Sequence, residues 1–267
     1  MKKLSFVALL IVTFVLTFAG GVDRNLLKTK TYVLVHGAWQ APYAWNFVKE
    51  QIEKKGHRVI VVNLPGHTDD TTAPSAITLN LYRDKVVNAI NSVDGKVILV
   101  GHSFGGMSIS GTAEKIPDKI EKMVYVGAFL PASGQSALTL ASTDKNSLLG
   151  PSLQPSADQL TMDVKKENII NIFCADANAE IQELVKSNFK AEPAIPFTNS
   201  FELTPDHFGK VDKYYIHTLK DKNVSYPLQK QMVAAAGIKN VYSLNSSHCP
   251  FLTIPDQFTS LLLKISE

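Results

Sequence analysis

The chain has 267 residues, 45% of them hydrophobic, and 27 Lys and Arg against 24 Asp and Glu give it a formal net charge of +3. This length allows one large domain, or a core with an insertion, that buries a sizeable apolar core. The charged residues form no basic block, which argues against a nucleic-acid partner.

The first residues have the pattern of a targeting segment. Lys2 and Lys3 precede an apolar run from about Leu4 to Ala19, and small residues follow it. This is typical of a secretory signal peptide, which we assign to residues 1–20. The run of about 16 residues is shorter than the roughly 20 that span a bilayer. We expect export to the periplasm or the medium and no stable membrane span in the mature chain, with an N-terminal membrane anchor as the alternative.

Short apolar runs alternate with helical patterns along the rest of the chain. Strands are expected at residues 31–35, 57–62, 96–100, 122–126, 213–218 and 240–244. Helices are expected at about 42–55, 78–90, 107–114, 226–236 and 255–265. The strands are continuously apolar, which is typical of a parallel sheet covered by helices on both faces. The sequence therefore predicts an α/β fold with a mostly parallel sheet.

The alternation breaks over residues 131–208. This segment contains several prolines and two helical patches, near 157–164 and 179–189. A long irregular stretch inside a compact domain is usually a lid or a binding element. We predict an inserted helical cap there, between an N-terminal core part at 21–130 and a C-terminal core part at 209–267. A set of ordinary surface loops is the alternative.

One pentapeptide, Gly101-His102-Ser103-Phe104-Gly105, lies between a predicted strand and a predicted helix. In that context G-x-S-x-G is the nucleophile elbow of an α/β-hydrolase, a sharp turn that exposes the serine hydroxyl above the sheet. The alternative is a Gly/Ser-rich turn that only closes a strand. The elbow predicts Ser103 as a nucleophile.

A serine nucleophile needs a base to accept its proton and an acid to orient that base, and in this fold the chain order is Ser, Asp or Glu, His. His248 lies just after the last predicted strand, and Asp221 follows strand 213–218 by a short turn. We predict them as base and acid. Asp206 and Asp212 are rivals for the acid, but neither follows a strand end.

The oxyanion of an acyl-transfer reaction needs two backbone N–H donors. We expect one from Phe104, directly after the nucleophile, and one from Ala38, in the loop where Gly37 permits a sharp turn. No metal or cofactor is expected. Candidate walls of the substrate pocket, each of which alone is more often a core residue, are Trp39, Phe129, Phe173, Cys249 and Phe251.

Six motifs extend this pattern over nearly the whole chain: Val35-His36-Gly37-Ala38-Trp39, Leu64-Pro65-Gly66-His67, the elbow with Gly106, Ala128-Phe129-Leu130-Pro131, Thr218-Leu219-Lys220-Asp221 and Ser247-His248-Cys249-Pro250-Phe251. On these motifs the chain resembles the plant methylesterase and hydroxynitrile lyase group of α/β-hydrolases and its bacterial esterase relatives. The resemblance implies the same triad and oxyanion donors, and a helical cap over an apolar pocket.

Two departures within that group bear on the reaction. The cyanohydrin-cleaving members carry a lysine directly after the catalytic histidine and a threonine in the first-strand loop. Here those places hold Cys249 and Gly37-Ala38. Because the lysine would stabilise departing cyanide, its absence makes hydroxynitrile lyase activity an unfavoured alternative.

We therefore expect a serine esterase that cleaves small carboxylic esters with an apolar or aromatic part. Fold and triad do not separate this reaction from C–C bond hydrolysis, lactone opening or perhydrolysis. A non-catalytic binding protein on a hydrolase scaffold is the remaining alternative. The sequence leaves open the oligomeric state and whether Cys174 and Cys249 form a disulfide.

Overall fold

The computed structural model describes residues 29–267. The predicted signal peptide lies outside the described residues and stays a prediction. Within the described range, no helix combines the length and apolar character needed to cross a membrane.

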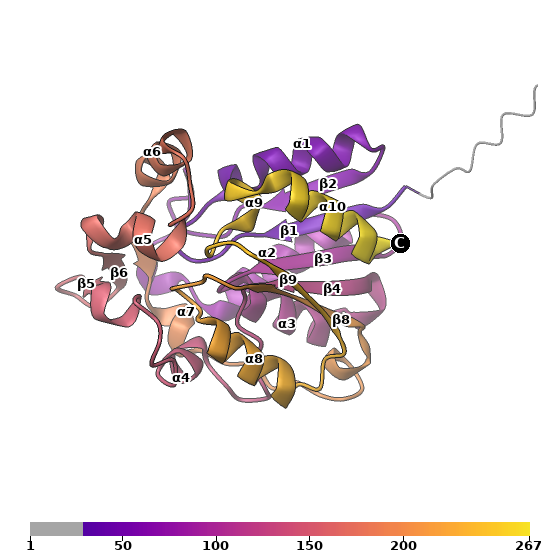
Figure 1. The fold of residues 1–267 in the computed structure, drawn as a ribbon. Coiled ribbons are helices and arrows are strands. Elements are labelled where there is room, and N and C mark those ends of the chain that lie inside the picture. Colours follow the sequence, from indigo (N-terminus) through magenta and orange to yellow (C-terminus); the bar gives the residue numbers. More distant parts are fainter. Residues whose placement is uncertain (1–28) are drawn as a thin grey trace, which may run out of the picture.

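A six-stranded parallel sheet forms the centre of the molecule (Figure 1). Its strands, in the order β2-β1-β3-β4-β8-β9 across the sheet, are β1 (Thr31–Val35), β2 (Arg58–Val62), β3 (Val97–His102), β4 (Ile120–Val126), β8 (Lys213–Thr218) and β9 (Asn240–Leu244). Every residue of β3 is buried, as a central strand covered on both faces requires. The predicted α/β fold is confirmed, and each predicted strand is present within two residues of its expected ends.

Helices cover both faces of this sheet. They are α1 (Asn46–Lys54), α2 (Leu79–Asn91), α3 (Gly105–Lys115), α8 (Tyr226–Ala235), α9 (Pro250–Thr253) and α10 (Pro255–Ser266). The chain moves from β1 outward to β2 and then back past β1 to β3, so right-handed crossovers put α1 and α2 on opposite faces. Consistent with this, α1 packs against α10, and α2 packs against α3.

Local signals explain where these helices begin. Thr78 precedes α2, and its hydroxyl accepts a hydrogen bond from the Leu81 N–H (3.2 Å), which satisfies one of the free donors of the first turn. The predicted helix at 42–55 begins instead with a 3-10 turn at Pro42–Trp45, and Pro42 opens that turn where no N–H donor is needed.

The segment between β4 and β8 gathers at one end of the sheet, beyond the carboxyl ends of the strands (Figure 1). We call it the cap. It contains four short helices, α4 (Ala137–Ala141), α5 (Ile169–Phe173), α6 (Ala179–Asn188) and α7 (Ile195–Thr198). It also contains a small antiparallel sheet of β5 (Leu153–Pro155), β6 (Thr161–Val164) and β7 (Glu192–Pro193). The inserted helical cap is therefore confirmed, whereas the domain boundaries around it stay predictions.

One predicted helical patch in the cap is wrong. Residues 157–164 form a turn followed by strand β6, not a helix. Leu160, Met162 and Val164 recur at every second position, which is the period of a strand, and β6 pairs with β5 and β7. The second patch, at 179–189, corresponds to α6.

Candidate active site

Ser103 lies in the turn between β3 and α3. Its φ angle is +52°, a left-handed conformation that a serine adopts only where its surroundings hold it there. The turn is too tight for side chains on either side. A Cβ at Gly101 would lie 2.9 Å from the Gly105 carbonyl oxygen, and one at Gly105 would lie 2.8 Å from that of His36. This is the strained strand-to-helix geometry of a nucleophile elbow.

His248 and Asp221 are brought together as predicted. His248 Nδ1 lies 2.7 Å from Asp221 Oδ2, and both side chains are fully buried. The carboxylate is held from three sides: the N–H groups of Asn223 (2.8 Å) and Val224 (3.0 Å) bind Oδ1, and the Thr218 hydroxyl binds Oδ2 (2.6 Å). A carboxylate that accepts the Nδ1–H leaves Nε2 as the basic nitrogen of the ring.

The loop that carries His248 packs against the turn that carries Ser103. The His102 Nε2–H donates to the His248 carbonyl oxygen (2.9 Å), and the two imidazole rings lie 4.4 Å apart. Among residues 29–267, His248 Nε2 is buried and has no hydrogen-bond partner. The structure therefore does not join it to Ser103 by a hydrogen bond. Such bonds are often long without substrate and tighten only in the reacting complex.

The rivals for the acid lie elsewhere. Asp206 and Asp212 are both exposed, and within the described residues neither pairs with His248. Asp221 is thus the carboxylate that contacts the imidazole.

The two predicted oxyanion donors belong to segments that meet at Ser103, since Phe104 follows Ser103 and Ala38 follows Gly37. Gly37 approaches Ser103 so closely that a Cβ on Gly37 would lie 2.7 Å from the Ser103 Cβ. Within residues 29–267, neither the Ala38 N–H nor the Phe104 N–H donates to another backbone group. Both N–H groups therefore lack a backbone acceptor, as the donors of an oxyanion hole must before substrate binds.

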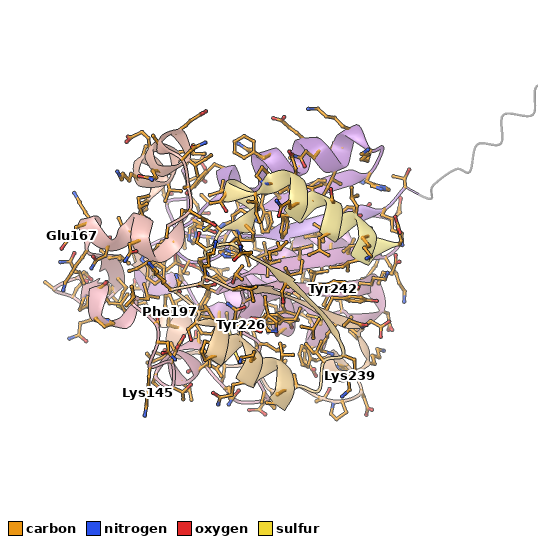
Figure 2. The ribbon with its side chains drawn as sticks, in the orientation of Figure 1. Lys145, Glu167, Phe197, Tyr226, Lys239 and Tyr242 are labelled. Carbon is orange, nitrogen blue, oxygen red and sulfur yellow. The ribbon has the colours of Figure 1, made fainter. Side chains whose placement is uncertain are left out.

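A row of aromatic rings runs from Phe104, next to Ser103, to His248. The centroid distances are 4.6 Å from Phe104 to Phe197, 5.6 Å from Phe197 to Trp39, 5.8 Å from Trp39 to Phe173, and 5.8 Å from Phe173 to His248. Phe197, labelled in Figure 2, comes from cap helix α7. No sequence pattern singled out Phe197, because only the folded cap brings it to Phe104.

Three further predicted wall residues are also buried. Phe129 is 5% exposed, whereas Cys249 and Phe251 are fully buried. Phe251 packs against Trp45, with ring centroids 4.4 Å apart, so it contributes to the core. Their contact with substrate stays a prediction.

Both cysteines are free thiols in this structure. Cys249 Sγ accepts a hydrogen bond from the Gln40 side-chain amide (3.0 Å). Burial raises the pKa of the Cys249 thiol well above its ordinary value, and the neighbouring Cys174 raises it further. The thiol beside the base is therefore neutral.

The site offers no evident place for a metal ion. Over the described residues, no group of three or more His, Cys, Asp and Glu side chains is arranged to hold one.

Comparison with known proteins agrees with this architecture. The model of the Alpha/beta hydrolase family matches residues 32–261. Methylesterase 9 of Arabidopsis thaliana is 28% identical over 89% of this chain and 98% of its own length. A protein of the same plant named as chloroplastic methylesterase 11 is 29% identical over 92% of this chain, which spans 66% of that longer protein.

Solved structures show the same fold. Polyneuridine aldehyde esterase matches with a TM-score of 0.81 and 24% identity, over 90% of this chain and all of its own. A pyrethroid hydrolase from Sphingobium faniae JZ-2 matches with a TM-score of 0.79 and 24% identity, over 88% of this chain and 96% of its own. At this identity the two structures bear on fold alone. The resemblance drawn from the six motifs is confirmed by the plant relatives.

Proposed function

Because the chain belongs to the alpha/beta hydrolase family, we propose that it hydrolyses carboxylic esters through a triad of Ser103, His248 and Asp221. Its methylesterase relatives make carboxylic ester hydrolysis the class of activity. The observation that carries the residue assignment is the buried contact of 2.7 Å between His248 and Asp221, beside a serine in the left-handed turn of the elbow.

In the proposed reaction, Ser103 Oγ attacks the ester carbonyl carbon while His248 Nε2 takes the hydroxyl proton. The carbonyl oxygen becomes an oxyanion that accepts hydrogen bonds from the N–H groups of Ala38 and Phe104. The tetrahedral intermediate then collapses, and the alcohol leaves with the proton from His248. Water, activated by the same imidazole, hydrolyses the acyl-enzyme and returns the serine.

Asp221 stabilises the imidazolium that forms in both steps. Its carboxylate cannot turn away from His248, because Asn223 and Val224 hold Oδ1 through their backbone N–H groups. This fixed contact favours the Nδ1–H tautomer, in which Nε2 can act as the base.

The proposed substrate is a small ester with an apolar or aromatic part. Support comes from the row of rings from Phe104 to Phe173, which offers apolar and aromatic contacts on the cap side of the nucleophile. Methyl esters are suitable first probes, because the plant relatives are named methylesterases.

Hydroxynitrile cleavage remains unfavoured. The residue after the base is Cys249, a buried thiol whose raised pKa keeps it uncharged. No cation therefore follows His248 to stabilise a departing cyanide ion.

The test is hydrolysis of short-chain aryl esters and aryl-acid methyl esters by the wild type and by Ser103→Ala. We expect turnover to fall to background in the variant, with unchanged thermal unfolding, and labelling by a fluorophosphonate probe to be lost. Ser108→Ala is the matched control, because the buried Ser108 hydroxyl has no partner among the described residues. Unchanged turnover in Ser103→Ala would exclude the mechanism.

A further inference from the structure

A buried carboxylate of the cap reaches into the core beside the oxyanion loop. Glu192, on β7, is 1% exposed. Its Oε2 accepts hydrogen bonds from the Trp39 backbone N–H (2.8 Å) and from His67 Nε2 (2.9 Å), and its Oε1 accepts one from the Tyr82 hydroxyl (3.0 Å). Three donors from three segments of the core thus converge on one cap side chain.

The partner His67 faces hydrogen-bond acceptors at both of its ring nitrogens. Its Nδ1 faces the carbonyl oxygens of Leu64 (3.3 Å) and Pro65 (3.0 Å), while its Nε2 faces Glu192, so each ring nitrogen has only acceptors and needs its own hydrogen. Burial lowers the pKa of His67, but the Glu192 carboxylate outweighs burial and raises it above the ordinary value. His67 and Glu192 thus form a buried pair that joins the core to the cap.

The residue that Glu192 holds is strained. Trp39 has a φ angle of +58°, and a bulky residue keeps this conformation only when its surroundings impose it. Both of its N–H donors bind the cap: the backbone N–H binds Glu192, and the indole Nε1–H donates to the Met162 carbonyl oxygen on β6 (2.8 Å). The cap thus fixes the turn directly after the oxyanion donor Ala38.

We propose that Glu192 is a positioning residue, which holds the Ala38–Trp39 peptide in place so that the Ala38 N–H meets the oxyanion. This inference rests on the proposed function, since an oxyanion forms only if Ser103 attacks a carbonyl. A misplaced donor weakens binding of the transition state more than that of the substrate. The turnover number should therefore fall while KM changes little.

The experiment compares Glu192→Ala and Glu192→Gln with Tyr82→Phe. We expect kcat to fall roughly 10- to 100-fold in Glu192→Ala, since misplacement of a catalytic group by about 1 Å can cost 10²-fold. Glu192→Gln keeps one acceptor oxygen of the same reach and should recover part of that loss. Tyr82→Phe is the matched control: it removes one bond to the same carboxylate, leaves the Trp39 bond, and should keep kcat within about threefold of wild type.

A second readout is independent of ester hydrolysis. Amide hydrogen exchange over residues 37–40 should be faster in both Glu192 variants than in the wild type and in Tyr82→Phe. If the wild type cleaves no ester, the proposed function fails, and the exchange measurement still decides whether Glu192 holds the turn at Ala38 and Trp39.

Two results would overturn the proposal. One is wild-type kcat and wild-type exchange at 37–40 in folded Glu192→Ala. The other is an equal loss of kcat in Tyr82→Phe, which would mean that any damage to this buried cluster acts through stability. If Glu192→Ala does not fold, Glu192→Gln decides in the same way, through its kcat and exchange relative to Tyr82→Phe.

Discussion

At the scale of single residues, the acid of the proposed triad is the most tightly bound side chain of the site. Besides its contact with His248, Asp221 accepts two backbone N–H bonds, one hydroxyl bond and one bond from the Gln229 side-chain amide. Those partners fix the direction of the carboxylate before any substrate binds, so the loop after β8 serves to orient the imidazole.

Asp221→Asn should abolish most of the activity without unfolding the protein. An amide opposite His248 Nδ1 favours the wrong tautomer, and the loss of this acid costs about 10⁴-fold in kcat in serine enzymes of this kind. The measurement is kcat on an aryl ester, with thermal unfolding as a check on the fold. Asp212→Asn, at an exposed position, should retain wild-type kcat. Near-normal turnover in Asp221→Asn would transfer the acid role to another carboxylate.

The placement of Ser103, Asp221 and His248 at one edge of the sheet could be predicted because each follows the end of a strand, and parallel strands end at the same edge. Ser103, Asp221 and His248 all occupy such positions. Glu192 and Phe197 could not be predicted, since their contacts depend on how the cap folds back over the core. A lone glutamate or phenylalanine in an irregular segment has no periodicity that points to a partner.

At the scale of elements, the link between α5 and α6 is bound to the loop that carries His248. The Asp176 carboxylate accepts the Ser247 backbone N–H (2.8 Å) and the Ser247 hydroxyl. Ser247 directly precedes His248. This exposed aspartate therefore ties the cap to the loop that carries His248, in addition to the contact between Glu192 and the Trp39 N–H.

Asp176→Ala should loosen this loop. We expect a loss of about 1 kcal/mol in the free energy of unfolding, which is less than the roughly 1.5 to 3 kcal/mol of hydrogen bonds to charged groups because the aspartate is exposed to water. A fall of several-fold in kcat should accompany it. Urea unfolding and ester kinetics measure the two effects. Asp158→Ala is the control, because Asp158 bonds only within its own turn of the cap, to Ser156 and Leu160. Equal losses of stability and kcat in Asp176→Ala and Asp158→Ala would contradict a specific role of Asp176 in holding the His248 loop.

Long elements could be predicted and short ones could not. Helix α2 shows apolar residues at helical spacing over 13 residues and a capping threonine, and its boundaries agree with the prediction. Strands β5, β6 and β7 have three, four and two residues, too few to establish a period. These strands pair because the folded cap brings them together, which their own short sequences do not indicate.

At the scale of the whole molecule, buried histidines set the pH dependence of stability. Burial lowers the pKa of His36 and of His102 well below 6.5, so the unfolded chain binds more protons than the folded one just below that pH. Their contribution to stability is present above pH 6.5 and is lost as the pH falls. His67, whose pKa is raised, behaves in the opposite way, and its contribution is lost as the pH rises through the raised value.

The free energy of unfolding should therefore be greatest near pH 6.5 and fall on both sides. Urea unfolding between pH 5 and pH 9 measures the profile. His67→Gln should make stability fall less steeply above pH 6.5. Because His67 also lowers the pKa of the neighbouring His36, the loss of stability below pH 6.5 should become slightly smaller too. His207→Gln, at an exposed position, should leave both limbs as they are. An alkaline limb that is identical in His67→Gln and the wild type would show that the His67–Glu192 pair does not produce it.

The attachment of Trp39 to the cap bears on how this scaffold can be diversified. A cap grafted from another hydrolase would bring new pocket walls, but it would also remove the carboxylate of Glu192 and the carbonyl group of Met162 that bind the two Trp39 donors. In such a chimera the turn at Ala38 and Trp39 would lose both hydrogen bonds to the cap, unless the grafted cap carries acceptors at the same two places. New specificity is therefore more accessible by exchanging side chains within the existing cap, at Phe173 and Phe197, than by exchanging the cap as a module.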